Sequence, residues 1–154
     1  MKRLLCALLA IMLLLGCACA EGTMLRVGFE DGFSLNLPEG WLHYPVGEEM
    51  TRQGVNYCLS DASAQRWLYI QIWKSECADA DELAALIERT ASPRSSGAYS
   101  FNGVDCVIYD LAAGDVSCCA ALLDGSIVNF VFTPQSDGDY MMTAAQIMSS
   151  ICPI

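Results

Sequence analysis

Residues 98–132, AYSFNGVDCVIYDLAAGDVSCCAALLDGSIVNFVF, decide the fold class of this chain. Two dipeptides in this stretch, Asn102-Gly103 and Asp124-Gly125, suit two-residue type I′ hairpin turns, because both central residues of such a turn take positive φ. A slightly longer loop, residues 112–115, lies between them. The stretch therefore predicts four consecutive antiparallel strands, and it contains no reaction motif.

Strand patterns also occupy the first half of the chain. In Phe33–Leu37, apolar residues alternate with Ser34 and Asn36, which predicts a strand with one buried face. Two helices are predicted from residues that share one helical face. The first has Leu83, Leu86, Ile87 and Thr90 at spacings of 3, 4 and 7, and the second has Met141, Ala144, Ala145, Met148 and Ile151. The predicted hairpins are 24–30 with 33–37 and 55–60 with 67–74, and the predicted helices are 78–90 and 139–151.

The predicted element order is ββββ-α-ββββ-α, with two main helices. Strand runs interrupted by only two helices favour an α+β domain with a mainly antiparallel sheet of about six to eight strands. Residues 47–49 and 92–97 are predicted to be loops. The first helix has two possible caps, Asp79 and Asp81.

The N-terminus resembles a secretory signal. Lys2 and Arg3 precede the apolar run Leu4–Leu15, which is short for a membrane span, and small residues follow. Cleavage after Ala20 would release a single domain, residues 21–154. Alternatively, residues 14–17 (LLGC) resemble a bacterial lipobox, in which the signal ends at residue 16 and Cys17 carries the lipid. We favour the exported, soluble form, with membrane attachment only if Cys17 is lipidated.

The chain is acidic, with 18 Asp and Glu against 8 Lys and Arg and a formal net charge of −10. Such a surface repels phosphate backbones, so we expect no nucleic-acid partner. Beyond the leader, no stretch approaches the roughly 20 apolar residues of a membrane helix.

An exported chain can form disulfides, and six cysteines remain after cleavage at Ala20. Neighbours Cys118 and Cys119 should point to opposite faces of one strand, and Cys119 should lie near Cys106 on a diagonal position. Cys77 and Cys152 lie at element ends, either paired or free. The disulfide candidates are therefore Cys106, Cys119, Cys77 and Cys152, with buried free thiols as the alternative.

The order of elements resembles the PsbP-like fold family, which includes photosystem II extrinsic proteins, a Ran-binding nuclear import factor and small bacterial exported proteins. The matching features are the segment FSLNLPEGW (residues 33–41), the mid-chain helix, the Asn102-Gly103 hairpin and the helix end QIMSSI (residues 146–151). This resemblance implies a binding or assembly role without common catalytic residues. The ion contacts of the photosystem members have no matching motif here.

Catalytic chemistry has little support in the sequence. His43 is the only histidine, so a Ser-His or Cys-His hydrolase would have to use it. The pairs Asp79/Asp81 and Asp137/Asp139 resemble fragments of calcium loops, but each precedes a helix, where aspartates cap N–H groups. We predict no catalytic residue, no metal site and no cofactor.

Aromatic residues are the most suggestive feature, because they form interface hot spots and platforms for peptides or sugars as well as packing cores. The sequence therefore predicts a non-catalytic binding or assembly module of the bacterial cell envelope with a protein or peptide partner. The alternatives are a small hydrolase using His43 and a small-ligand carrier. The candidate binding residues are Trp41, Tyr44, Trp67, Tyr69, Trp73 and Tyr99.

Overall fold

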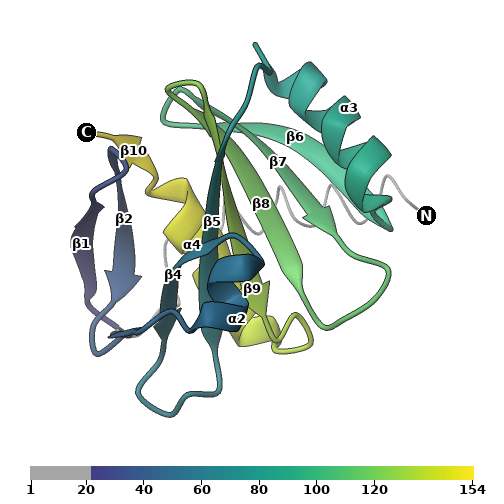
Figure 1. The fold of residues 1–154 in the computed structure, drawn as a ribbon. Helices are drawn as coiled ribbons and strands as arrows, with labels where there is room; N and C mark the ends of the chain where they lie inside the picture. The colour runs from purple at the N-terminus through teal and green to yellow at the C-terminus, as the bar shows by residue number, and fades with distance from the viewer. Residues whose placement is uncertain (1–21) are drawn as a thin grey trace.

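Two antiparallel sheets form the framework of residues 22–154, the part of the chain that the computed structural model describes (Figure 1). The predicted α+β class with two main helices is confirmed. In chain order the elements are β1 Met24–Phe29, β2 Phe33–Pro38, β3 Leu42–Tyr44, α2 Glu48–Arg52, β4 Val55–Ser60, β5 Trp67–Lys74, α3 Ala80–Ala91, β6 Ser95–Phe101, β7 Val104–Asp110, β8 Ser117–Leu123, β9 Ser126–Thr133, α4 Gly138–Ser149 and β10 Cys152–Pro153.

The larger sheet has seven strands in the order β3-β4-β5-β9-β8-β7-β6, and the smaller has the order β1-β2-β10. The predicted meander is confirmed as β6 to β9. Its two tight turns have positive φ at both central residues, 53° and 80° at Asn102 and Gly103, and 44° and 69° at Asp124 and Gly125. These turns match the twist of the strands that they join.

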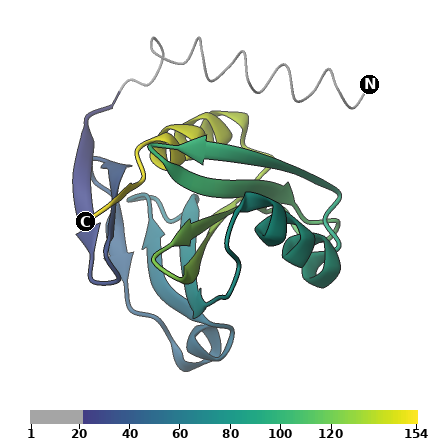
Figure 2. The same cartoon turned by 90° about the horizontal axis from the view of Figure 1, so that it is seen from above.

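The inner face of the seven-stranded sheet packs against α4 and the three-stranded sheet. Its core contains Leu68 and Ile70 from β5, Phe33 from β2, and Tyr140 and Ile147 from α4, all fully buried. Figure 2 shows α4 and α3 on opposite sides of the large sheet. The inner face therefore holds the main apolar core of the domain.

The outer face is covered by a helix over only part of its width. Helix α3 contacts β6, β7 and β8 through Leu83 and Ile87, which pack with Val107, Cys118 and Ile127. No such long helix lies over β3, β4 and β5 within residues 22–154; the five-residue α2 contacts β4 there. The β3-β4-β5 half of the outer face is thus the more open one.

Several boundaries differ from the sequence prediction. The predicted polar loop 47–49 opens α2, because its glutamates suit the positive end of a helix and pair with Arg52 at 3.7 and 3.8 Å. The predicted loop 92–97 is also wrong in its second half, since β6 begins at Ser95, which pairs with Asp110. The last helix ends at Ser149, and β10 then pairs Cys152 with Ser34 of the small sheet.

The cap of α3 is Asp79, whose carboxylate accepts hydrogen bonds from the backbone N–H groups of Asp81 and Glu82. We expect Asp79→Ala to lower the free energy of unfolding by about 1 kcal/mol, because two helix N–H groups lose their acceptor. Urea denaturation measures this change. Asp81→Ala, at an acid that caps nothing, should cost clearly less, and equal losses for the two variants would contradict the assignment.

Residues 1–21, which include the predicted signal and Cys17, lie outside the described part of the chain. Within residues 22–154, no helix is both long and apolar enough to cross a bilayer.

Candidate functional site

Three aromatic rings meet on the open half of the outer face. In the register of the sheet, Tyr44 of β3 is opposite Cys58 of β4, and Cys58 is opposite Tyr69 of β5, so these side chains share one face. Trp67 precedes Tyr69 by two residues and projects on the same side. The ring centroids of Tyr44 and Trp67 are 5.1 Å apart, and the parallel rings of Trp67 and Tyr69 are 6.0 Å apart. We call these three residues the aromatic patch.

The indole of Trp67 is fixed, because its Nε1–H donates to the carbonyl of Ala64 at 3.0 Å. All three rings of the patch are half-buried, so each keeps part of its surface in solvent. Burial, together with the neighbouring Cys58, raises the pKa of Tyr69, and its phenol therefore stays neutral at neutral pH. The patch is an uncharged, partly exposed surface that is anchored by the indole of Trp67.

A chain of hydrogen bonds borders the aromatic patch. The hydroxyl of Tyr109 donates to Asn129 Oδ1 at 3.0 Å, and Asn129 Nδ2 donates to Gln71 Oε1 at 2.9 Å. Gln71 Nε2 then donates to the carbonyl of Gln53 at 2.9 Å, just beyond α2. This chain satisfies Asn129, which is 4% exposed, and holds the side chain next to Tyr69 in place.

The remaining predicted aromatic residues lie elsewhere. Trp73 is on the same face of β5 but at its far end, opposite Ile127, with 43% of its surface exposed. Tyr99 is on the inner face, because its register partner Cys106 belongs to the inner core, and its ring stacks on Phe101. Trp41 packs toward α4, with its ring centroid 6.0 Å from that of Tyr140. The structure therefore brings together only part of the predicted set.

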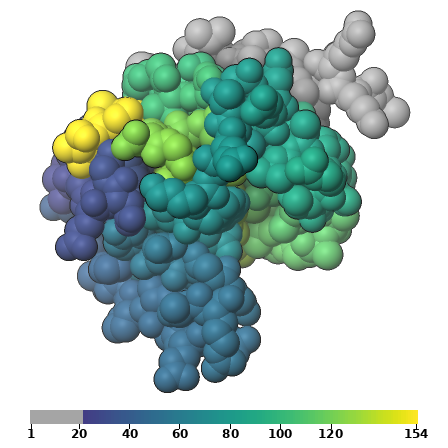
Figure 3. All heavy atoms as spheres, turned by 45° about the horizontal axis from the view of Figure 1, so that its top comes forward, coloured from purple at the N-terminus to yellow at the C-terminus, as the bar shows by residue number. Residues whose placement is uncertain are grey.

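Helix α2 carries two exposed acidic side chains on this half of the molecule. In Figure 3, the blue segment that carries β3, α2 and β4 forms a lobe that protrudes from the body of the domain. On this lobe, the side chains of Glu48 and Glu49 are 95% and 77% exposed. Arg52 pairs with both of them, so a partner that docks beside α2 meets two carboxylates and one guanidinium, a surface of net negative charge.

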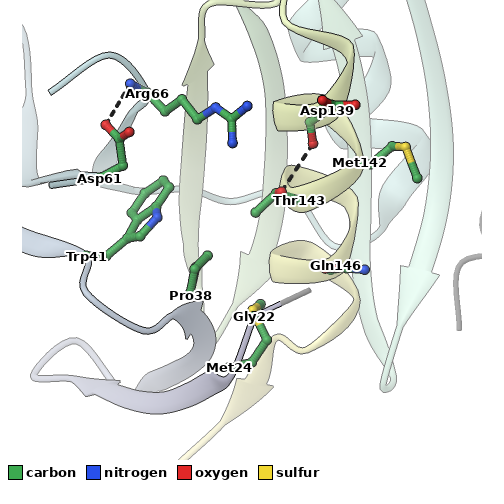
Figure 4. A pocket seen from close by; sticks show the side chains of 10 residues that line it. All are labelled: Gly22, Met24, Pro38, Trp41, Asp61, Arg66, Asp139, Met142, Thr143 and Gln146. Atoms are coloured by element: carbon green, nitrogen blue, oxygen red, sulfur yellow. Dashed lines mark hydrogen bonds between the residues drawn. The ribbon is translucent and has the colours of Figure 1, made fainter. Parts of the chain in front are cut away.

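A cavity of about 410 Å³ lies between the 61–66 loop and the N-terminal part of α4, from Asp139 to Gln146 (Figure 4). Its wall includes Trp41, Pro38 and Met24 from the N-terminal part of the domain. Figure 4 shows the guanidinium of Arg66 reaching into it between the indole and the helix. The polar lining residues are Asp61, Arg66, Asp139, Thr143 and Gln146.

Arg66 is the anchored charge of this cavity. Its Nε donates to Asp137 Oδ2 at 2.8 Å, and its guanidinium lies 5.8 Å from the ring centroid of Tyr140. The Tyr140 N–H and the Arg66 guanidinium together hold the pKa of Asp137 below its usual range. Asp61 has a lowered pKa as well, although burial opposes the shift, because it accepts hydrogen bonds from Ser63 and from the N–H groups of Arg66 and Gln65. These carboxylates stay ionised at neutral pH.

The cysteines partly follow the sequence prediction. Cys118 and Cys119 point to opposite faces, as predicted, since they belong to the outer and inner cores. The thiols of Cys119 and Cys106 are hydrogen-bonded neighbours, which together with burial raises the pKa of Cys119. No disulfide joins the cysteines of residues 22–154; all six are free thiols: Cys58, Cys77, Cys106, Cys118, Cys119 and Cys152.

The residues that the sequence analysis considered for catalysis or calcium binding lie on an exposed strand or at helix caps. His43 is exposed on β3, and its ring lies 5.9 Å from that of Tyr57. Asp79 and Asp137 cap helices, which is the role that the sequence favoured over calcium binding. In residues 22–154 no cluster of three or more His, Cys, Asp or Glu side chains has the arrangement of a metal site.

Sequence reasoning missed the cavity and its central residue, Arg66. Its partner Asp137 lies 71 residues further along the chain. Both residues sit in loops, where no hydrophobic period relates one position to another. The one available signal was Arg66 itself, a lone arginine in a polar loop of an acidic chain. The sequence alone does not indicate which carboxylate it pairs with.

Comparison with known proteins shows the fold but no close relative. No family model matches the sequence. No curated protein matches it significantly. Among solved structures, the solution structure of cyanobacterial PsbP (CyanoP) from Synechocystis sp. PCC 6803 matches with a TM-score of 0.62 and 14% identity, covering 89% of this chain and 98% of the other.

A crystal structure from Bacteroides thetaiotaomicron VPI-5482 matches with a TM-score of 0.60 and 12% identity, over 88% of this chain and 49% of the other. At these identities the matches show the fold alone. The predicted resemblance is confirmed at that level, and the chain has the PsbP-like fold.

Proposed function

We propose that this protein is an exported, non-catalytic binding module of the bacterial cell envelope, with a protein or peptide partner. The observation that carries the proposal is the aromatic patch of Tyr44, Trp67 and Tyr69 on the open half of the outer face. Aromatic side chains have only two side-chain torsions, so they bind with little loss of conformational entropy, and Tyr and Trp are enriched at interface hot spots. Export is supported by the signal-like pattern at residues 1–20.

The chemistry of the patch indicates what kind of segment it binds. A partner side chain that stacks on Trp67 or Tyr69 is aromatic, or is a cation attracted to the ring face. The exposed Glu48 and Glu49 beside it favour positive charge in the partner. The preferred ligand is therefore a peptide segment with aromatic and basic side chains.

Selection from a random peptide library displayed on phage tests this function. We expect the purified protein to enrich peptides rich in Arg, Lys and aromatic residues. Tyr69→Ala should weaken their binding by about thirtyfold, because truncating a hot-spot ring costs about 2 kcal/mol or more. Tyr99→Ala, which removes a half-buried ring from the inner face, is the matched control and should bind as the parent does.

Failure to enrich any peptide over the bare support would overturn the proposal. So would enriched peptides whose Kd is the same for Tyr69→Ala and the parent protein. Fluorescence anisotropy with labelled copies of the selected peptides supplies the Kd values.

A further inference from the structure

The cavity at the start of α4 is separate from the aromatic patch. Consecutive residues Arg66 and Trp67 point in different directions: Arg66 lines the cavity, whereas Trp67 lies in the patch. The volume of about 410 Å³ falls within the range of small-molecule sites, about 300–1,000 Å³. The cavity can therefore hold a ligand independently of a peptide on the outer face.

The wall of the cavity is fixed by contacts within the domain. Arg66 is held between Asp137 and the ring of Tyr140, and Tyr140 is itself fully buried with its hydroxyl donating to the carbonyl of Trp67 at 2.6 Å. Trp41 packs on the same Tyr140 ring. A preorganised wall of this kind needs little rearrangement when a ligand binds.

Several polar groups of the lining have no partner among residues 22–154. The terminal nitrogens of Arg66 donate no hydrogen bond there, since its ion pair uses Nε. The carboxylate of Asp139 and the side-chain amide of Gln146 are likewise without hydrogen bonds in the described chain. The cavity thus offers donors from Arg66, acceptors from Asp139, and both from Gln146.

The charges of the lining disfavour simple ions. Asp137 already neutralises Arg66, and Asp61 and Asp139 leave the region negative, which repels a free anion. A small cation would in turn face the guanidinium that reaches into the cavity (Figure 4). A neutral ligand avoids both penalties.

Hydroxyl groups match this set of donors and acceptors, because a hydroxyl both donates, as Asp139 requires, and accepts, as Arg66 requires. The indole of Trp41 supplies an apolar surface against which the C–H face of a sugar ring can pack. We propose that the cavity is a binding site for a neutral carbohydrate, of the size of a mono- or disaccharide.

Titration of the purified protein with defined sugars tests this proposal. The probes are glucose, galactose, N-acetylglucosamine and the disaccharide cellobiose, with sodium acetate, methylammonium chloride and glycine as the charged comparisons. Binding is followed by calorimetry and by the NMR signal of the Trp41 indole. We expect saturable binding of at least one neutral sugar, with a shifted Trp41 signal and no saturable binding of the charged probes.

Two variants locate the site. Asp139→Asn and Gln146→Ala should each weaken sugar binding by about tenfold, the effect of losing one hydrogen-bonded group. Neither side chain makes a hydrogen bond within the described domain, so the unfolding midpoint should stay unchanged for Gln146→Ala. It should fall only slightly for Asp139→Asn, because Asp139 is the acid in the first turn of α4. Trp73→Ala and Tyr69→Ala, which alter aromatic rings outside the cavity, should bind the sugar as the parent does.

Three results would overturn the proposal: no saturable binding of any of the four sugars, tighter binding of acetate, methylammonium or glycine, or sugar binding that both cavity variants leave unchanged. Because Tyr69→Ala affects only the peptide surface, each of the two sites can fail without the other.

Discussion

Replacing Phe33 by alanine is expected to lower the free energy of unfolding by about 3–5 kcal/mol, the usual cost of removing a buried phenylalanine ring. Phe33 is 0% exposed on β2. Its ring stacks on Phe29 at 4.7 Å and meets the edge of Phe130 at 5.8 Å. Phe130 belongs to β9 of the large sheet, so the substitution opens a cavity where the two sheets meet.

A loss of that size is a large part of the 5–15 kcal/mol that stabilises a typical domain. Urea denaturation followed by tryptophan fluorescence measures it, with an unchanged m-value as evidence of two-state unfolding. Leu25→Ala is the matched control, because Leu25 is 48% exposed on the neighbouring strand and should cost at most about 0.5 kcal/mol. A Phe33→Ala loss below about 1 kcal/mol would contradict the role given to this ring.

Stability is also expected to fall steeply above pH 9, when the protein is kept under reducing conditions. Burial raises the pKa of Cys118 to about 11, and burial with the adjacent Asp31 raises the pKa of Tyr57 to about 12. The folded state therefore favours the protonated, neutral forms. The unfolded chain loses these protons at lower pH, so the stabilisation is complete below the ordinary thiol pKa of about 9 and is lost as pH rises toward 11.

For Cys118 alone, the loss between pH 9 and pH 11 should be about 2–3 kcal/mol. Urea midpoints measured at intervals from pH 7 to pH 11 give the slope. Cys118→Ala should flatten the first part of this decline, whereas Cys77→Ala, at a half-exposed thiol, should leave it unchanged. Stability that stays constant up to pH 10.5 would show that the buried thiols are not linked to folding.

Local patterns predicted the strands whose partners are near in sequence. The dipeptides Asn102-Gly103 and Asp124-Gly125 placed the meander, because their backbone preference acts without help from the rest of the chain. The bounds of β4 and β5 also agree with the prediction, since both have strong β-formers and a period of two.

The two shortest strands were missed. β3 and β10 have three and two residues, too few to show any period. Cys152 of β10 pairs with Ser34, and the hydroxyl of Ser34 donates to the carbonyl of Cys152 across 118 positions of sequence. Such contacts form only after the core has brought the strands together, so no local pattern predicts them. For this reason the sequence predicted one sheet, whereas the structure has two.

In the candidate site, too, local patterns predicted one part correctly and missed the part that depends on tertiary contacts. The period of β5 correctly put Trp67 and Tyr69 on one face, and the register then added Tyr44. Counting aromatic residues could not separate Trp41 and Tyr99 from this group. The turn after β2 directs Trp41 toward Tyr140 of α4, and the pairing of β6 with β7 places Tyr99 on the inner face of the sheet.

The pairing of β5 with β9 has a consequence for the order of folding. These strands join the two halves of the large sheet, from Trp67 opposite Thr133 to Lys74 opposite Ser126. During synthesis, β5 therefore exposes an unpaired apolar edge until residues 126–133 have emerged, and the high sequence separation of such contacts slows folding. A sheet that closes this late leaves the first half of the domain without its central pairing until the second half has been made.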